Sequence, residues 1–413
     1  MLSIKELYKI GNGPSSSHTM GPRRATKLFK ENYPEADRFD VILYGSLAAT
    51  GKGHLTDEII RKEVFPIEIN IIFDTKTECK VHPNTMDLIA YKEEKELGKW
   101  TVYSIGGGDI QIKGQERIVK EDIYDLKKFK DIREYCISHN MHLYDYVYEK
   151  EGKEEIQAFL KEIWYTMKKC VQEGIRTEGT LPGRLKINRR AKELFYLAKG
   201  EETPEFTQSR LLSAYAYAVS ETNAAGGIIV TAPTCGSAGV LPAVLYYLEE
   251  KNGYSDEEII NALATAALIG NVVKTNASIS GAECGCQAEI GTACSMAAAA
   301  VGELYHLTVE QIEDAAEVAM EHHLGLTCDP IYGYVQIPCI ERNAIAAMRA
   351  IDACNMSILL PDKNRISFDM VVDTMYETGK DLSSHYKETS EGGLAKKYCR
   401  NKYYNTSLER KLK

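Results

Sequence analysis

The sequence lacks several features that would assign its class at once. Its 413 residues begin without a basic stretch, a long apolar core and a small-residue cleavage site, so we expect no secretory signal and a cytoplasmic protein. Acidic residues outnumber basic ones by 59 to 50, which leaves no electrostatic footprint for nucleic acid. No repeat with a period of about 20 to 50 residues indicates a solenoid. With these classes excluded, we expect a soluble protein of the size of an enzyme.

A membrane-spanning helix is also not expected. One charge-free run, 226–248, has the length of a membrane span. It contains two prolines, four glycines and several hydroxyl groups, which suit a lipid-exposed helix poorly. We therefore expect a buried loop and helix at 226–248 and no membrane partner.

Two sets of paired C-x₂₋₄-C knuckles, the usual sign of structural zinc, are absent as well. Eleven cysteines are an odd number, and a reducing compartment argues against a disulfide framework. Four isolated cysteines are expected to be small core residues. Five others gather in two segments. The isolated ones are Cys79, Cys136, Cys170 and Cys354, and the gathered ones are Cys284, Cys286, Cys294, Cys328 and Cys339.

The length predicts two domains, since one core rarely grows to this size. Residues 1–118 are expected to form an α+β domain and 119–413 a mostly helical domain, with a linker near 110–125. β-rich runs support the first part, and helical periodicity with two capping boxes, at Ser255 and Thr308, supports the second. The predicted strands are 39–47, 66–74, 86–92 and 100–106.

The second cysteine segment follows a predicted helix over 309–323. Gly325 and Pro330 prevent that helix from continuing, so Cys328 is expected on a loop just past its end. Pro338 precedes Cys339, which predicts irregular backbone there too. Loop cysteines near helix ends can bind metals. The spacing alone singles out neither zinc nor an iron–sulfur pattern, and it leaves open whether a metal is bound.

Seven motifs in order along the chain resemble one family, the iron–sulfur-dependent L-serine dehydratases. The motifs are GPSSSHTMGP (13–22), GSLAATGKGHLTD (45–57), HPN (82–84), SIGGG (104–108), TAPTCGSAGVLPAVL (231–245), SISGAECGCQAEIGTACSMAAA (278–299) and TCDPIYGYVQIPCIERNA (327–344).

The resemblance implies a β-type and an α-type domain fused in one chain, and a [4Fe–4S] cluster bound by Cys286, Cys328 and Cys339. Three thiolates on four irons would leave one iron open to act as a Lewis acid. Cys399 follows a motif after which such chains tend to end, so it is a candidate removable fourth ligand; here fourteen residues come after it. The implied reaction removes water from L-serine and gives aminoacrylate, then pyruvate and ammonia. The family also suggests a homodimer.

His54 lies after a Gly-rich turn and is the candidate general base, because histidine usually takes such protons near neutral pH. Hydroxyls ahead of a helix, and a second hydroxyl pair at a Gly-rich helix entry, are candidates to bind the substrate's charged groups. The candidate substrate-binding residues are Ser15, Ser16, Ser17, His18, His82, Asn84, Thr234, Ser237, Asn276, Arg342 and Asn343.

Departures from the family pattern leave the substrate open. Tyr332 and Tyr334 stand where a glycine pair is expected after Asp-Pro, Thr85 replaces a common glycine, and Arg184 replaces a common proline. L-Threonine or another β-substituted amino acid is therefore an alternative substrate. A pyridoxal-phosphate enzyme using Lys274, and a noncatalytic amino-acid sensor, are the rival classes.

Overall fold

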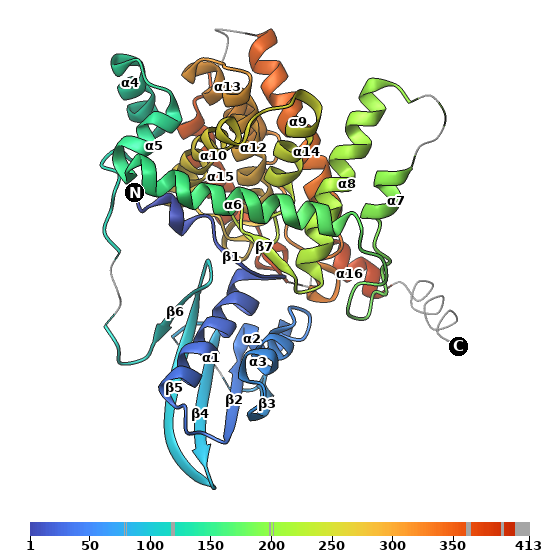
Figure 1. The fold of residues 1–413 in the computed structure, drawn as a ribbon. Coiled ribbons are helices and arrows are strands. Elements are labelled where there is room, and N and C mark those ends of the chain that lie inside the picture. The colour runs from blue at the N-terminus through green and yellow to red at the C-terminus, as the bar shows by residue number, and fades with distance from the viewer. Residues whose placement is uncertain are drawn as a thin grey trace. The chain divides into compact units, whose positions relative to one another are not determined.

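The computed structural model describes residues 1–77, 79, 81–116, 120–197, 200, 202–360, 365–389 and 392–400. Within them the chain forms two compact units, a sheet-containing α+β unit of Gly11–Lys120 with Ala225–Ile228, and a helical unit of Met1–Ile10, Glu121–Ala224 and Ile229–Lys413. The predicted fold class is confirmed (Figure 1). The predicted boundary between residues 118 and 119 lies outside the described residues, and the domain limits stay a prediction.

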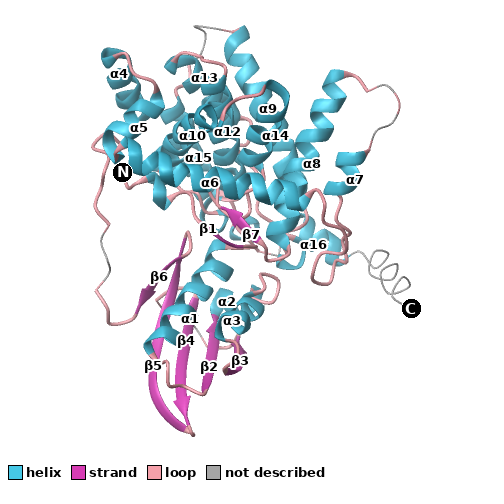
Figure 2. Cartoon of the chain, viewed as in Figure 1, coloured by secondary structure: helices cyan, strands magenta, loops and turns pink. Residues whose placement is uncertain are grey.

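A five-stranded sheet forms the centre of the α+β unit, in the order β3-β2-β4-β5-β6 (Figure 2). Strands β2 and β3 are parallel, and the other neighbours are antiparallel. The four predicted strands are confirmed, although 45–47 begins a helix. The fifth strand was not predicted, and it overlaps the start of the predicted linker near 110–125. The strands are β2 (Arg38–Tyr44), β3 (Glu68–Asp74), β4 (Thr85–Lys92), β5 (Lys95–Gly106) and β6 (Asp109–Ile112).

One face of this sheet carries the core of the unit. Burial alternates along β2, where Phe39, Val41 and Leu43 are buried, as expected for a strand with one covered face. Phe29 and Ile60, from two helices, belong to the same apolar cluster. The helical segments of this unit are the π-helical turn η2 (Ser16–Met20), α1 (Gly21–Asn32), α2 (Gly45–Thr50) and α3 (Thr56–Val64).

The helical unit contains long and short helices, joined by turns and by longer loops. Both predicted capping boxes are formed, by Ser255 with Glu258 and by Thr308 with Gln311. The helices are α4 (Phe129–His139), α5 (Leu143–Glu151), α6 (Lys153–Gly174), α7 (Ala191–Tyr196), α8 (Pro204–Ala224), α9 (Val240–Asn252), α10 (Asp256–Asn276), α11 (Gly281–Cys284), α12 (Thr292–Leu304), α13 (Val309–Glu321), α14 (Cys339–Leu359), α15 (Phe368–Asp381) and α16 (Gly393–Arg400). Shorter segments are η1 (Ile4–Glu6), η3 (Gln287–Gly291), η4 (Ile331–Gly333), η5 (Ser384–Tyr386) and the paired strands β1 (Ile10–Asn12) and β7 (Ile228–Val230).

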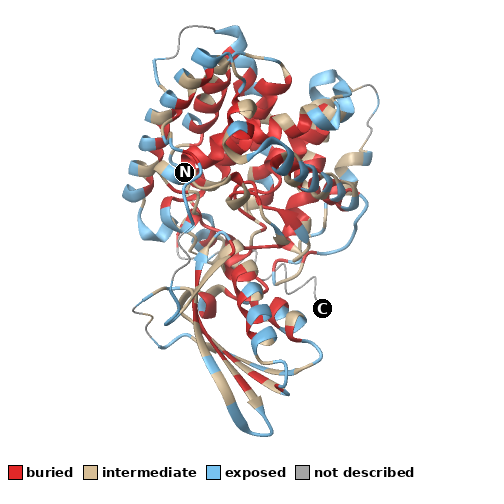
Figure 3. Cartoon of the chain, turned by 60° about the vertical axis from the view of Figure 1, so that its left-hand side comes forward, coloured by how far each residue is buried: buried red, intermediate tan, exposed pale blue. Residues whose placement is uncertain are grey.

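Helix α12 is the centre of the helical unit, and all of its residues are buried (Figure 3). Its alanines allow neighbouring helices to approach closely, and Ser295 donates a hydrogen bond of 2.7 Å to the Ala316 carbonyl of α13. Cys294 is buried within this helix. The charge-free run 226–248 contains β7, a loop and the buried start of α9, which confirms the expected loop and helix. Among the described residues, no helix combines the length and apolar character that crossing a bilayer requires.

Candidate functional site

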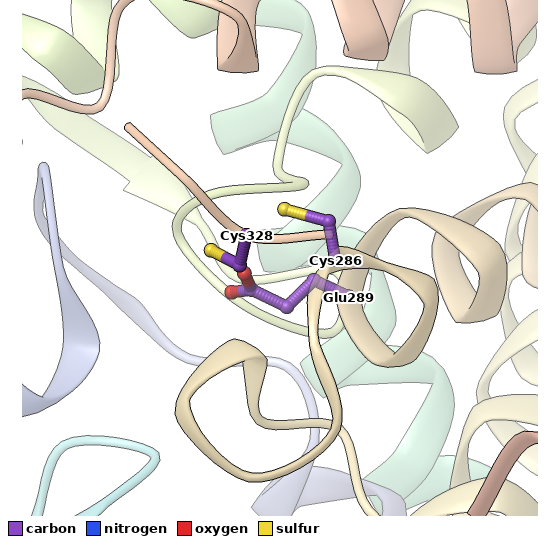
Figure 4. Close-up of side chains that lie close together, drawn as sticks. All are labelled: Cys286, Glu289 and Cys328. Atoms are coloured by element: carbon purple, nitrogen blue, oxygen red, sulfur yellow. The ribbon is translucent and has the colours of Figure 1, made fainter. Parts of the chain in front are cut away.

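Two of the predicted ligand cysteines meet in the helical unit. Cys286 lies between α11 and η3, and Cys328 lies on the loop after α13. Their sulfurs and a carboxylate oxygen of Glu289 all lie within 4.8 Å of one another. Figure 4 shows the three side chains pointing toward the same space. Thiolate and carboxylate donors at this spacing are suited to a metal centre.

Backbone contacts fix the two cysteine loops against each other. Gly285, just before Cys286, has a φ of 76°, and a Cβ there would lie 2.8 Å from the Leu326 carbonyl oxygen. The Gln287 amide donates to that same carbonyl at 3.2 Å, and the Gln287 side chain accepts from the Gly325 amide at 2.9 Å. The loop that carries Cys328 is therefore held close to the turn that carries Cys286.

Cys339 is the first residue of α14, so the prediction of irregular backbone at this cysteine was wrong. Pro338 takes the capping position, where its missing amide hydrogen costs nothing. Burial raises the pKa of the Cys339 thiol, and the charges of Cys286 and Glu289 raise it further. The charges of Cys286 and Glu289 therefore act on Cys339, although its sulfur is not among the atoms that lie within 4.8 Å of one another.

Without a metal, the thiols of Cys328 and Cys339 hold their protons. The pKa of Cys328 is raised well above its usual value, first by its hydrogen bond with Cys286 and then by burial. A bound metal favours the deprotonated thiolate, so it would replace these protons. Arg342 supplies positive charge nearby. Burial lowers its pKa, but Cys286 and Cys339 outweigh this and raise it.

The arginine is anchored on the Cys328 loop. Arg342 donates to the Thr327 carbonyl at 2.6 Å and lies 3.5 Å from the carboxylate of buried Asp329. Asp329 also accepts from the Leu394 amide of α16 at 2.5 Å. The predicted substrate contact Arg342 therefore sits beside the cysteines, already bound to the loop that carries one of them.

Sequence reasoning missed two carboxylates beside the cysteines. Glu289 accepts a hydrogen bond of 2.7 Å from Thr234, and burial raises its pKa. Burial and the charge of Glu289 raise the pKa of Glu388 to about 8. Glu289 follows Cys286 by three residues, a spacing that could have flagged it. Nothing local marks Glu388, which reaches the site because its amide donates to the Cys328 carbonyl at 2.9 Å.

The predicted base and its neighbours lie in the α+β unit. The ring of His54 packs against that of His18 in a tilted arrangement, with centroids 4.6 Å apart and the ring planes at 33°. Nδ1 of His54 lies 3.1 Å from the Thr50 carbonyl, so it carries the proton in that hydrogen bond, while Nε2 is buried and has no partner within the described part of the chain. Burial lowers the pKa of His54 to about 4. The ring is neutral near pH 7, with a free lone pair on Nε2.

Hydroxyls surround His18. Its Nδ1 lies 2.8 Å from Ser17 Oγ, and its Nε2 lies 2.9 Å from the hydroxyl of Ser46, a residue that sequence reasoning did not single out. Ser15 Oγ lies 3.3 Å from Ser17 Oγ and accepts from the His18 amide at 3.2 Å. Burial, followed by the charge of His54, lowers the pKa of His18 well below its usual value. Ser16 opens the π-helical turn that carries these groups.

His82 and Asn84 lie on the turn before β4. Nδ1 of His82 accepts from the Asn84 amide at 3.0 Å, and Thr85 donates to the His82 carbonyl at 2.6 Å. The replacement of glycine by Thr85 therefore adds a hydrogen bond to this turn. The side-chain oxygen of Asn84 is buried and lacks a partner among the described residues, so it could accept a hydrogen bond from a ligand.

Three other predicted contacts hold the loop after β7. Ser237 is fully buried and its hydroxyl lies 3.1 Å from that of Thr234. Asn343 uses its whole amide: it donates to the Gly236 and Cys339 carbonyls at 2.8 Å each and accepts from the Gly239 amide at 2.9 Å. Asn276 bonds instead to the Lys127 and Val272 carbonyls. Their roles toward a substrate stay predictions.

The remaining candidates have partners of their own. Cys399 on α16 hydrogen-bonds with Tyr332, whose φ of 55° is rare for a residue with a side chain. The Arg184 amide donates to the Tyr334 hydroxyl at 3.3 Å, so the unusual tyrosines anchor a neighbouring loop. Lys274 donates to the Glu6 carbonyl at 2.7 Å. Of the isolated cysteines, Cys136, Cys170 and Cys354 are buried as predicted, whereas Cys79 is only half-buried.

Comparisons with known proteins agree with this arrangement. Residues 3–63 match the family model described as serine dehydratase beta chain, and 79–395 match that described as serine dehydratase alpha chain. L-serine dehydratase of Haemophilus influenzae is 41% identical over 96% of this chain and 99% of its own length. L-serine dehydratase of Streptomyces coelicolor and L-serine dehydratase 1 of Escherichia coli are each 39% identical, over 95% and 96% of this chain and 98% and 99% of their own lengths. The chain belongs to the serine dehydratase family, with the beta-chain and alpha-chain regions joined in one polypeptide.

Proposed function

We propose that this protein is an L-serine ammonia-lyase that removes water from L-serine to give aminoacrylate, which hydrolyses to pyruvate and ammonia. The observation that carries the proposal is the grouping of Cys286, Cys328 and Glu289 within 4.8 Å, in a chain about 40% identical over nearly its full length to proteins named L-serine dehydratase. The enzyme is a lyase acting in the cytoplasm, and we expect a homodimer.

The proposed cofactor is a [4Fe–4S] cluster. Cys286, Cys328 and Cys339 would hold it, since two of these thiols already lie together and the third is electrostatically coupled to them. When bound, the cluster supplies a Lewis acid that stabilises negative charge on the leaving hydroxyl oxygen. Cys399 is the proposed removable fourth ligand, and its hydrogen bond with Tyr332 would have to break for that role.

His54 is the proposed general base for the α-proton. The hydrogen bond from Nδ1 to the Thr50 carbonyl fixes the tautomer that leaves Nε2 able to accept a proton. The low pKa keeps that nitrogen unprotonated before substrate binds. The ring of His18 packs against that of His54 and limits its orientation, and the ring of His18 is itself held by Ser17 and Ser46.

Polar groups of each unit are proposed to contact the charged groups of the substrate. In the α+β unit these are Ser15, Ser16 and Ser17 at the entry to α1, with His82 and Asn84 on the turn before β4. In the helical unit Thr234 and Ser237 lie at the entry to α9, while Asn343 supports that loop and Arg342 adds positive charge.

Anaerobic purification followed by iron, sulfide and pyridoxal analysis, with a pyruvate assay on L-serine, tests the proposal. We expect about four irons and four sulfides per chain, no pyridoxal, and pyruvate formed from L-serine faster than 2-oxobutyrate from L-threonine. A preference for L-threonine would change the substrate but keep the chemistry. Substantial pyridoxal without iron, or bound metal without turnover, would reject the proposed function.

A further inference from the structure

The carboxylates of Glu289 and Glu388 lie beside Cys286 and Cys328, and the proposed function gives them no cation to bind. Thr234 occupies one oxygen of Glu289 at 2.7 Å, and Figure 4 shows the carboxylate of Glu289 pointing toward the same space as both sulfurs. No hydrogen bond or ion pair engages the side chain of Glu388 within the described residues, although the charge of Glu289 acts on it. A half-buried carboxylate without a partner is uncommon, so Glu388 and the second oxygen of Glu289 need an explanation.

The charge of Arg342 acts on Glu289, but the bonds of its guanidinium group go to other residues. The guanidinium of Arg342 binds the Thr327 carbonyl at 2.6 Å, lies 3.5 Å from Asp329 and interacts with Cys286. Metal binding would convert the cysteines to thiolates and would increase the negative charge beside Glu289 and Glu388. The charge of the site therefore favours a ligand that brings a positive group.

The backbone holds both carboxylates in place. Glu388 has a φ of 56°, a strained value for a non-glycine residue, and it is kept there by its amide bond to the Cys328 carbonyl. Glu289 fits against two glycines: a Cβ on Gly281 would lie 2.5 Å from Oε2, and one on Gly236 would lie 3.2 Å from Oε1. Oε1 is already bonded to Thr234, so Oε2 is the oxygen left for a ligand.

We infer that Glu289 and Glu388 bind the α-ammonium group of the amino-acid substrate. The inference rests on the proposed function and extends it, because it assigns specific partners to the ammonium group of L-serine. An ammonium offers three donors, enough to bond Glu289 Oε2 and Glu388 together. A bound ammonium would favour the ionised form of both carboxylates and form charge-assisted hydrogen bonds with them. A substrate without the ammonium would lack this gain.

The test compares two ligands on the iron-loaded enzyme. L-Serine carries the ammonium, whereas 3-hydroxypropionate has the same carboxylate and β-hydroxyl without it. Equilibrium binding is measured anaerobically in the His54→Ala background, where L-serine should bind without turnover. Into this background we introduce Glu388→Gln, Glu289→Gln, or the control Glu377→Gln, an exposed carboxylate on α15. Iron and sulfide are measured in every sample.

We expect Glu388→Gln and Glu289→Gln to weaken L-serine binding by roughly 10- to 100-fold, since each removes a hydrogen bond to a charged group. Binding of 3-hydroxypropionate should change by less than about threefold, and the control should match the background for both ligands.

Equal weakening of both ligands, or no weakening of L-serine with full iron, overturns the inference. Loss of iron in a Gln variant also overturns it, because that residue then holds the cluster. If the parent enzyme neither holds iron nor forms pyruvate from L-serine, the proposed function fails instead, and the Gln variants are not needed to show it.

Discussion

The cysteine group of the helical unit and the histidine pair of the α+β unit differ in how complete they are. Around His18 and His54 nearly every polar atom has a partner, and one nitrogen, Nε2 of His54, is left over. The thiols of Cys286 and Cys328 bond to each other, and this bond together with burial raises the pKa of Cys328. The side chain of nearby Glu388 has no hydrogen-bond or ion-pair partner among the described residues. The polypeptide alone completes the histidine group, whereas the cysteine group is proposed to be completed by a metal centre.

This difference indicates how the two groups should respond to mutation. A preorganised base is supported by its neighbours, so changing it should affect chemistry and leave the fold intact. A ligand set is completed by the metal it binds, so changing it should affect metal content first and chemistry as a consequence. Measurements that report metal content and turnover separately can therefore test whether the two groups respond differently to mutation.

The largest effect is expected from removing a thiol. Cys286→Ser, Cys328→Ser and Cys339→Ser should each lower bound iron severely and abolish turnover, because a hydroxyl is a poor ligand for iron. Iron analysis and the pyruvate assay check this. The control is Cys354→Ala on α14, a buried thiol of the same helix as Cys339, which should keep its iron. Full iron in any of the three Ser variants would remove that cysteine from the ligand set.

His54→Ala should give the opposite pattern. Loss of a general base typically slows turnover by about 100- to 10,000-fold, while iron per chain should stay at the parent level. Removing the buried, unpartnered Nε2 should also leave the α+β unit folded. Near-normal turnover would eliminate His54 as the base, and a parallel loss of iron would contradict the separation of the two groups.

How much of this could be predicted from sequence differs between the two groups. The cysteines stand out because their motifs are contiguous, and the strands and capping boxes follow local patterns that a sequence displays directly. Glu388 could not be found this way. Its place depends on a φ of 56° and on a backbone bond to Cys328 from a distant segment, and neither leaves a local signal.

The errors have physical reasons as well. Pro338 predicted irregular backbone at Cys339, but a proline at a helix start initiates the helix instead. Strand β6 was not predicted because it is only four residues long, and its pairing with β5 rather than its own composition makes it a strand. Long-range pairing and burial therefore account for what the local patterns left out.

A smaller effect on the cysteine group is expected from Gly281→Ala. The added Cβ would lie 2.5 Å from Glu289 Oε2 and 3.3 Å from the Cys328 sulfur, so one of these side chains must shift. We expect a severalfold lower iron content or a cluster that is lost faster in air. The exposed neighbour Ala282, changed to Ser, is the control. Unchanged iron and air sensitivity would mean that the site relaxes freely around the methyl group.

Acid should destabilise both units. Burial lowers the pKa of His54 to about 4 in the α+β unit and that of His323 to about 4 in the helical unit. An unfolded histidine titrates near 6.5, so this stability is fully present above about pH 6.5 and is lost as the pH falls towards 4, by up to about 3 kcal/mol per residue.

Each unit contains one tryptophan, which allows the acid effect to be assigned. Denaturant unfolding of Trp164→Phe follows Trp100 in the α+β unit, and that of Trp100→Phe follows Trp164 in the helical unit. Adding His323→Gln should reduce the acid dependence of the Trp164 signal and leave that of the Trp100 signal unchanged. Equal changes in both signals would show that the units unfold together.

The smallest effect on the free energy of unfolding is expected at a carboxyl group of α13. Its pH dependence is opposite to that of the histidines. Burial raises the pKa of Glu317 to about 8, with the charge of Glu321 adding to it, and Oε1 of Glu317 has no partner in the described part of the chain. The folded group keeps its proton above pH 4.5 while the unfolded group loses it, so this contribution to stability falls as the pH rises towards 8.

Glu317→Gln should therefore raise the free energy of unfolding at pH 8 by about 1 kcal/mol and change it little at pH 5. Denaturant unfolding of the Trp164 signal measures this, and exposed Glu310→Gln on the same helix is the control. A gain of the same size at both pH values would mean that better packing, rather than the charge of Glu317, is responsible.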